Sequence, residues 1–357
     1  MSVILLLFGI HVIVSMRFSK AGSFNRDYIS REESTAVKGV FTALVFMSHF
    51  SQYIEVGPYD QTYRVFQNHL NQMVVSMFWF YSGYGILESI RNKGRDYVVH
   101  FPVRRLLTVW IDYALAVCLY LVLWITDKRS LTPGRLFFSM IGWQNVGNSN
   151  WYMFATFVLY ISVFFSFIGF RNTSDRKNLA AGLCLLTLFS VLFVYVEIKA
   201  GQPRYCYNTV ILFSMGGWYS LLREKAEKLL FSSEVFYFGT VLLMTAVYLV
   251  SYQYRKRYGI EGYTVWAVSF TLLTVLYTMK CSIRSHLLEW LGMHVFGIYI
   301  LQRIPMILLQ RAGLMENHKY ACFALSLAAT LFLAIMFRIV TDRMNRGVVR
   351  LCERTSV

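Results

Sequence analysis

The feature that most constrains the fold is an apolar segment that carries two ionisable side chains. It runs from Ala36 to Tyr53 as AVKGVFTALVFMSHFSQY and has the length of a membrane-spanning helix. Lys38 and His49 are eleven residues apart, which on an α-helix is three turns plus about 20°, so they share nearly one face roughly 16 Å apart along the axis. An ionisable residue inside a span is costly and marks a functional site by default. A hydrogen bond from His49 to another helix is the structural alternative.

Composition places the whole chain in the membrane class. Hydrophobic residues make up 56% and charged residues 15% of the sequence, and this balance lies outside the range of soluble domains. The formal charge of +16 indicates basic cytoplasmic loops, as in other polytopic proteins, and we expect no nucleic-acid partner. The six cysteines have no paired spacing, which argues against a disulfide framework and a zinc site. We expect no bound metal.

The apolar runs predict an all-α polytopic membrane protein with about eleven transmembrane helices. We expect one membrane-embedded domain over residues 1–357: an extra span and linker in 1–35, a ten-span core in 36–340 and a basic cytoplasmic tail in 341–357. The predicted spans are Val3–Met16, Ala36–Tyr53, Met73–Ile90, Leu106–Thr126, Trp151–Phe170, Leu179–Ile198, Cys206–Leu222, Val235–Tyr252, Tyr263–Met279, Leu287–Leu309 and Tyr320–Val340.

Loop charges predict the orientation of these spans. The larger share of the 35 Lys and Arg residues falls on the side that contains the segments 17–38 and 91–105, so this side is expected to be cytoplasmic. His49 then lies in the outer half of the bilayer. The basic loop 255–257 is the main exception to the pattern.

A basic cluster and an aromatic cluster accompany the Lys38/His49 face. The segment 91–105, expected to be a short loop, contains Lys93, Arg95, Arg104 and Arg105. Such a cluster can bind phosphates, but it is also what the positive-inside rule alone produces. At the start of a later span, Asn150, Trp151 and Tyr152 could contact a sugar ring, although Trp and Tyr are common at any membrane interface.

Two spans are more polar than a lipid-facing helix. The third contains Gly83 and Gly85, which let a neighbouring helix approach closely, together with Ser82 and Tyr84. The tenth contains His294, Gln302, Arg303 and Pro305. Both spans are therefore expected to face protein or water along part of their surface.

Taken in order, these segments resemble acyltransferase family 3, the polytopic bacterial enzymes that O-acylate surface polysaccharides and related glycans. The family has an Arg, ten residues and a His in its first core span, and Lys38 and His49 have that spacing here. FWFYSGYG resembles its aromatic segment ending in Ser82-Gly83-Tyr84, and FPVRRLLTVW its basic entry to the next span. SNWYM and LGMHVFGIYILQRIPM resemble two later motifs. The sequence departs from the family at Lys38, which replaces Arg, and at Asn150 and Gln302, where His is common.

The resemblance implies a function and a set of site residues. It implies transfer of an acyl group, usually acetyl, from cytoplasmic acyl-CoA to a hydroxyl of an extracytoplasmic or lipid-linked glycan, in the bacterial plasma membrane. The catalytic residues would be His49, as general base or transient acyl carrier, and Lys38, which with the arginines of 91–105 would hold the phosphates of the donor at the cytoplasmic mouth of the site. The donor residues would be Lys93, Arg95, Arg104 and Arg105; the acceptor residues would be Ser82, Tyr84, Asn150, Trp151, Tyr152, Gln302 and Arg303.

Two other classes fit the composition. A secondary transporter, or an exporter of a glycan or lipid precursor, also has many spans, but it more often shows repeated halves and interrupted helices, and we expect neither here. The second class is a membrane protein that acts as an interaction partner or sensor, and such a protein would not need a histidine base inside a span. Membrane lipids are expected partners in every case, and the sequence makes no prediction of oligomeric state.

Overall fold

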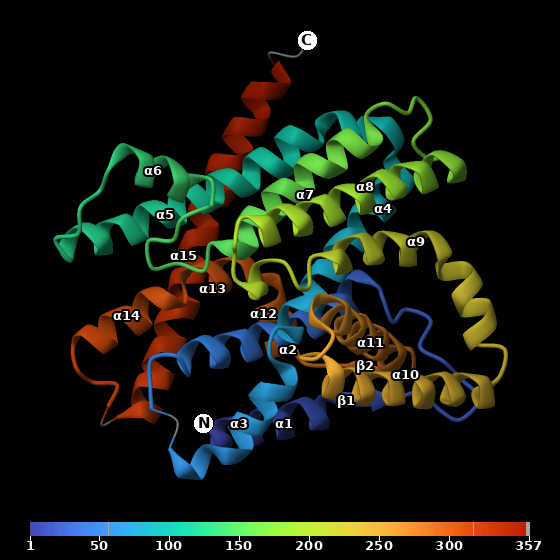
Figure 1. The fold of residues 1–357 in the computed structure, drawn as a ribbon, viewed down its shortest axis with the longest axis horizontal. Helices are drawn as coiled ribbons and strands as arrows, with labels where there is room; N and C mark the ends of the chain where they lie inside the picture. The colour runs from blue at the N-terminus through green and yellow to red at the C-terminus, as the bar shows by residue number, and fades with distance from the viewer. Residues whose placement is uncertain (56, 317, 355–357) are drawn as a thin grey trace. The chain divides into compact units, whose positions relative to one another are not determined.

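A computed structural model describes residues 1–55, 57–316 and 318–354. It is 78% helical, which confirms the all-α class (Figure 1). Internal contacts divide the chain into two compact units: unit 1 is Met1–Leu44, Gly57–Gly94 and Asn172–Met293, and unit 2 is Val45–Val56, Arg95–Arg171 and His294–Val357. The prediction of one domain stays a prediction, and each unit is described separately below.

The helices of unit 1 are α1 (Ser2–Ser15), α3 (Gln61–Leu70), α8 (Arg176–Lys199), α9 (Ile211–Leu230), α10 (Glu234–Tyr254), α11 (Gly259–Lys280) and α12 (His286–Met293), with 3₁₀ turns η1 (Pro58–Asp60) and η3 (Arg204–Cys206). Unit 2 contains a π-helical turn η2 (Pro102–Leu107), α5 (Thr108–Thr126), α6 (Pro133–Met140), α7 (Trp151–Phe167), α13 (Val295–Leu301), α14 (Arg303–Arg311) and α15 (Lys319–Arg354). Helices α2 (Arg31–Phe50) and α4 (Met73–Phe101) contribute residues to both units.

The described residues include five helical stretches long and apolar enough to cross a membrane, or six if the broken segment 286–311 counts as one span. The five lie within 58–126, 176–199, 234–254, 259–280 and 319–352. The shorter helices α1 and α7 are also apolar. The protein is therefore a multi-pass membrane protein, and the expected number of about eleven spans stays a prediction.

The predicted tenth span, Leu287–Leu309, is wrong as a single helix. Three short helices replace it, with interruptions at His294 and Gln302. Pro305 gives the reason for the second interruption, because its ring would clash with the carbonyl of residue 301 in a continuous helix, and α13 ends at Leu301. The expectation that the chain has no interrupted helix is wrong for the same reason.

Two segments predicted as loop or tail are helical. The segment 91–105 continues α4 and enters η2, with a break only at Gly94, whose φ of +64° suits glycine. The segment 341–357, expected to be a tail, extends α15 as far as Arg354. A periodic pattern of apolar residues predicts only the apolar part of a helix. Helical extensions that are rich in basic residues lack this pattern and were therefore not predicted.

Glycines bring pairs of helices in unit 1 into close contact. A Cβ atom at Gly83 of α4 would overlap the carbonyl oxygen of Phe213 in α9, and one at Gly216 of α9 would overlap that of Phe80 in α4. Gly39 of α2 and Gly292 of α12 approach the facing backbone in the same reciprocal way. The close approach expected from Gly83 is thus present, whereas Gly85 has no neighbour within 4 Å of such an atom.

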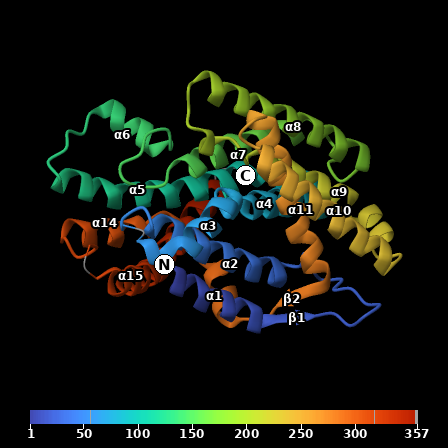
Figure 2. The same cartoon turned by 60° about the horizontal axis from the view of Figure 1, so that its bottom comes forward.

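A short β-ribbon ties the N-terminal linker to unit 1. Strand β1 (Met16–Phe18) pairs antiparallel with β2 (Cys281–Ile283), with Arg17 opposite Ser282 (Figure 2). The amino terminus is held as well, because its ammonium group lies 2.6 Å from Asp60. The start of the linker expected between the first two spans is therefore anchored to β2 through β1.

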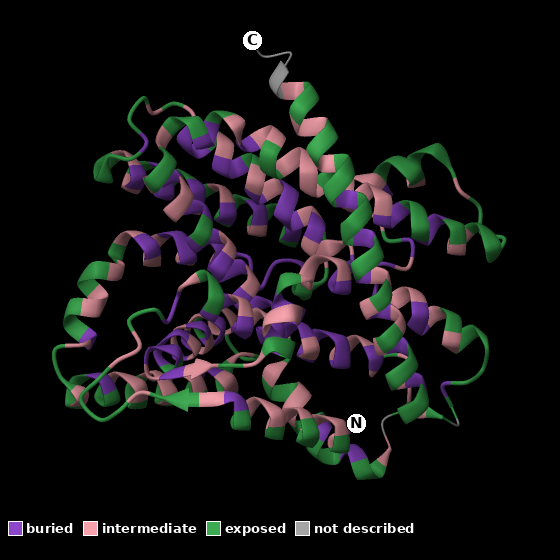
Figure 3. Ribbon diagram, turned by 180° about the vertical axis from the view of Figure 1, so that it is seen from behind, coloured by how far each residue is buried: buried purple, intermediate pink, exposed green. Residues whose placement is uncertain are grey.

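The core of unit 2 is aromatic. Phe46 and Phe50 of α2 contact the ring of Phe323 in α15 edge-on, and Tyr113 of α5 contacts Phe157 of α7. By contrast, most of α10 in unit 1 is exposed or half-buried (Figure 3), as expected for a helix that faces lipid.

Candidate active site

His49, in the last turn of α2, is the centre of a polar site in unit 2. Its imidazole is half-buried, and its Nδ1 atom is fully buried without a hydrogen bond to any described residue. The side chains of Gln302 and Arg303 lie within interaction range of the ring, and the ring of Tyr299 lies 6.1 Å away between centroids. The Oε1 atom of the fully buried Gln302 also has no partner among the described residues. The side chains of His49 and Gln302 interact, so these two buried polar atoms lie in one small region of unit 2.

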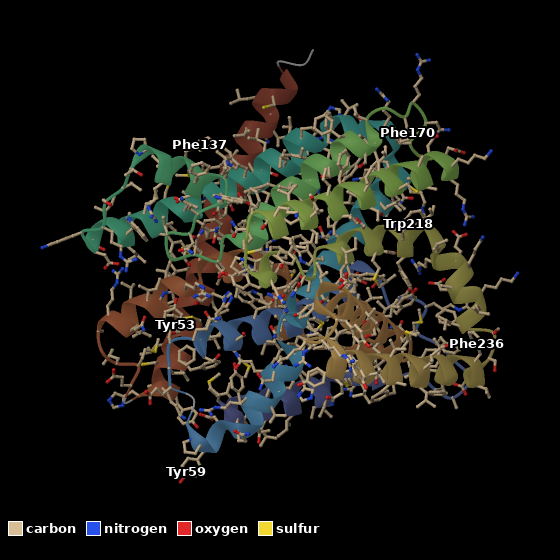
Figure 4. The ribbon with its side chains drawn as sticks, in the orientation of Figure 1. Tyr53, Tyr59, Phe137, Phe170, Trp218 and Phe236 are labelled. Carbon is tan, nitrogen blue, oxygen red and sulfur yellow. The ribbon has the colours of Figure 1, made fainter. Side chains whose placement is uncertain are left out.

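Arg303 organises this region with three hydrogen bonds to neutral acceptors. Its Nε donates to Ser149 Oγ at 2.8 Å, its Nη1 to the Tyr53 hydroxyl at 3.2 Å and its Nη2 to Gln52 Oε1 at 2.7 Å. Figure 4 labels Tyr53, just after α2. No carboxylate forms an ion pair with Arg303 among the described residues. Its charge is therefore positioned but not neutralised.

The loop before α7 supplies the next group of predicted residues. Asn150 donates from Nδ2 to the carbonyl of Gly142 at 2.6 Å, so its amide holds the loop closed. Gly142 and Gly147 have φ of +84° and +107°, conformations that favour glycine. The ring of Tyr152 lies 5.6 Å from that of Tyr299 and 5.8 Å from that of Trp151. These aromatic residues therefore belong to the same region of unit 2 as His49.

The interruption between α13 and α14 exposes backbone groups that the surroundings satisfy. Tyr120 of α5 donates its hydroxyl to the carbonyl of Ile300 at 2.8 Å, and Gln302 donates from Nε2 to the carbonyl of Tyr299 at 3.0 Å. The Tyr299 hydroxyl donates to the carbonyl of Ser149 at 3.0 Å. These bonds hold Gln302 and Arg303 in place at the break, since helix ends need such partners.

The predicted acceptor residues Ser82 and Tyr84 lie in unit 1, in a different environment. The Tyr84 hydroxyl accepts a hydrogen bond from Arg223 Nη1 at 2.9 Å, and Arg223 Nε lies 2.5 Å from Glu227. Tyr28, whose ring lies 5.4 Å from the Arg223 guanidinium, shares a 2.6 Å hydrogen bond with the Tyr219 hydroxyl. Tyr84 thus belongs to a closed polar cluster, while Ser82 is half-buried.

Lys38 also lies in unit 1, in the same helix as His49. Its side chain is half-buried, and it makes no ion pair within the described ranges 1–55, 57–316 and 318–354. Its nearest charged neighbour in electrostatic terms is another cation, Arg31. A half-buried cation without a counter-charge is available to an anionic ligand.

The four predicted donor residues do not behave alike. Lys93 belongs to unit 1, whereas Arg95, Arg104 and Arg105 belong to unit 2. Arg95 donates from Nη1 to the carbonyls of Ile168 and Phe170, both at 2.9 Å, and so satisfies the end of α7. Arg104 and Arg105 are exposed on η2. Exposed guanidinium groups suit phosphate contacts, so these two fit the predicted role better than Arg95 does.

Sequence reasoning missed several residues of the His49 site, namely Gln52, Tyr120 and Ser149. Ser149 directly precedes the predicted Asn150, and Gln52 lies three residues after His49, so spacing alone offered a weak signal. Among the described residues, no group of three or more His, Cys, Asp or Glu side chains is arranged to hold a metal ion.

The fold and site define a membrane protein whose candidate active site is a half-buried histidine beside a positioned guanidinium. The acyltransferase domain model of family 3 matches residues 32–341, nearly the whole chain. The chain therefore belongs to acyltransferase family 3, as the motifs indicated. Comparison with curated proteins and with solved structures gives no match.

Proposed function

We propose that this membrane acyltransferase moves an acetyl group from cytoplasmic acetyl-CoA to a hydroxyl of an extracytoplasmic or lipid-linked glycan. The proposal rests on the family membership and on one structural observation. This observation is the His49 imidazole, whose buried Nδ1 makes no hydrogen bond to any described residue and which lies beside Gln302 and Arg303.

An imidazole in this position suits acyl transfer. A glycan hydroxyl is a poor nucleophile until a base takes its proton, and neutral histidine does this near pH 7. The oxygen attacks the thioester carbonyl, the C–S bond breaks, and the proton passes by way of His49 to the leaving thiolate. In the alternative route His49 attacks first and holds the acyl group until the hydroxyl displaces it.

Arg303 is proposed to stabilise the negative oxygen that develops on the thioester carbonyl. Its three hydrogen bonds to neutral acceptors fix the fork without cancelling its charge, and preorganised charge of this kind lowers the barrier to acyl transfer. Trp151 and Tyr152 are proposed to contact the acceptor sugar, with Asn150 and Gln302 supplying polar contacts.

On the donor side, Arg104 and Arg105 of unit 2, which are exposed on η2, are proposed to contact the phosphates of coenzyme A. Lys38 of unit 1, which has no ion-pair partner in the described part of the chain, is proposed separately as a cation that an anionic ligand can contact. A higher apparent KM for acetyl-CoA in Arg105→Gln, with kcat retained, would support this assignment. An unchanged KM would indicate that the basic residues of η2 serve only to orient the helix in the membrane.

The test compares purified wild type, His49→Ala and His286→Ala in lipid nanodiscs, with acetyl-CoA as donor. The measurement is loss of the acetyl-CoA thioester that depends on an added glycan mixture, together with mass spectrometry of the glycan. His49→Ala should fall about 10²-fold or more, the scale for losing a general base. His286→Ala, whose imidazole is fully exposed, controls for the substitution itself. A His49→Ala protein with normal turnover would remove His49 from the mechanism.

A transporter is the competing function, and one observation favours it. Transporter sites are often built from interrupted helices, and the segment 286–311 is interrupted twice. The same experiment separates the two: a transporter would leave acetyl-CoA intact with every glycan, whereas the proposed enzyme consumes donor and acetylates glycan in equal amounts.

A further inference from the structure

The hairpin of α10 and α11 in unit 1 contains a surface groove that the acyl-transfer chemistry does not use. The groove has a volume of about 490 Å³ and opens to the outside of the bundle. Its walls are almost entirely apolar and come from the end of α10 and the start of α11: Ala246, Val247, Val250, Ser251, Tyr254, Tyr258, Glu261, Gly262 and Val265.

The groove lies at the end of α10 beside the loop to α11, where tyrosines are exposed. The two helices run side by side up to the loop that joins them (Figure 2), and the mouth is marked by Tyr254 and Tyr258, whose rings lie 6.0 Å apart. Exposed tyrosines are typical of the membrane interface. From Tyr254 back to Ala246 the groove extends along α10 by about 12 Å, at 1.5 Å per residue, which is long enough to hold part of a hydrocarbon chain.

The loop at the mouth is Arg255-Lys256-Arg257, the basic segment that the positive-inside pattern does not explain. Arg255 is used internally, since its guanidinium lies over the rings of Tyr252 at 3.6 Å and Trp266 at 5.0 Å. The ring of His69 stacks on Tyr252 at 4.2 Å. These contacts hold the loop in a defined conformation at the end of the groove.

The other two cations of the loop face outward. Lys256 and Arg257 are exposed, and neither forms an ion pair with a carboxylate of the described residues. Two uncompensated cations above an apolar groove are complementary to a molecule with a phosphate at one end and a hydrocarbon chain at the other.

We propose that this groove binds an anionic glycerophospholipid, with one acyl chain between α10 and α11 and the phosphate at Lys256 and Arg257. A phosphatidylglycerol headgroup fits this charge pattern, because its phosphate pairs with the two cations and its net charge is negative. Phosphatidylcholine carries an additional cation that the basic loop repels. The inference does not depend on the proposed acyl transfer.

The test is lipid titration of the purified full-length protein by native mass spectrometry, with phosphatidylglycerol and phosphatidylcholine of identical chains. Wild type should bind phosphatidylglycerol more tightly, and Lys256→Gln/Arg257→Gln should reduce that preference on the order of tenfold, as expected for two interfacial cations. Val250→Trp fills the groove at an exposed position and should weaken binding of both lipids.

Lys225→Gln/Lys228→Gln is the matched control, because it removes the same charge from exposed positions on α9 and should leave the lipid preference unchanged. Equal affinity of wild type for the two lipids would overturn the proposal, as would an equal loss in the control. A polyprenyl phosphate that binds in place of phosphatidylglycerol would overturn it in favour of a lipid-linked sugar carrier.

Discussion

The arginine clusters of the two units are built from the same residue types but differ in whether their polar groups are satisfied. In unit 1, Arg223 pairs with the carboxylate of Glu227 and with the hydroxyl of Tyr84. In unit 2, Arg303 has only neutral partners, and the adjacent His49 Nδ1 and Gln302 Oε1 lack any partner among the described residues.

This difference separates a structural cluster from a reactive one. A buried network whose charges are paired rigidifies the fold, whereas unsatisfied groups are costly and persist where function requires them. The Tyr84 hydroxyl has an internal partner, and the contact with substrate that its motif predicted stays a prediction. His49 and Arg303 are the residues for which a chemical role is proposed.

The largest effect is expected in the helix packing of unit 1. Gly83→Leu would drive a side chain into the backbone at Phe213, so the protein should fail to accumulate as a monodisperse species in detergent. Gly85→Leu is the matched control two residues further along α4, where no atom lies within 4 Å of an added Cβ. Size-exclusion profiles of the two variants measure this, and a well-folded Gly83→Leu protein would contradict the close contact.

Arg303→Lys tests the unsatisfied cluster directly. Lysine retains the positive charge but lacks the planar fork that reaches Gln52, Tyr53 and Ser149 together. Turnover should fall about 10²-fold, the scale for losing one preorganised donor at a developing oxyanion, while melting temperature changes little. The corresponding Arg223→Lys in unit 1 should lower the melting temperature and leave turnover nearly unchanged. Equal losses of turnover in the two variants would contradict the difference proposed between the two clusters.

Most of the helical content was predictable because apolar runs of helical length are themselves the physical requirement for crossing a bilayer. The interruptions were less visible. Pro305 marked one of them, but His294 at the other is not a helix breaker, and no local signal predicts a break there. The continuation of α4 to Phe101 and of α15 to Arg354 was missed because basic helices have no apolar stripe.

Candidate site residues were predictable where they belong to a sequence motif. Residues that only the fold brings next to the motif residues were not predictable. His49, Asn150, Trp151, Tyr152, Gln302 and Arg303 all lie in unit 2, as the resemblance implied for one site. The partners of Arg303 came from two other segments of the chain, and sequence spacing does not reveal which side chains reach a guanidinium. Tyr84 is a motif residue with an internal partner, Arg223, which its motif does not reveal, and its contact with substrate stays a prediction.

Lys38 of unit 1 belongs neither to the Arg223 cluster nor to the Arg303 cluster, so its role needs a separate test. If it contacts donor phosphate as a point charge, Lys38→Arg should retain most activity and Lys38→Met should lose about tenfold, near the lower end for a charge-assisted contact. Helix stability should be unaffected, because Met and Lys have similar helix propensities. Near-normal rates for both variants, measured as donor-dependent transfer per inserted molecule, would make Lys38 a snorkelling anchor.

The smallest kinetic effect is expected for Tyr84→Phe, and it is the sharpest test of the comparison. The change removes the hydroxyl that accepts from Arg223 Nη1, so a half-buried donor loses its partner at a cost of about 1 kcal/mol. Thermal stability in detergent should fall, while transfer per folded molecule stays within about twofold of wild type, since the cluster takes no part in the proposed chemistry.

Tyr53→Phe is the matched variant, because it removes a hydroxyl that accepts from Arg303 Nη1. There the fork loses one of three contacts beside His49, and turnover should fall more than stability does. If Tyr84→Phe instead lost activity at unchanged stability, its hydroxyl would contact substrate, as the motif first indicated, and the closed cluster of unit 1 would have to open during the reaction.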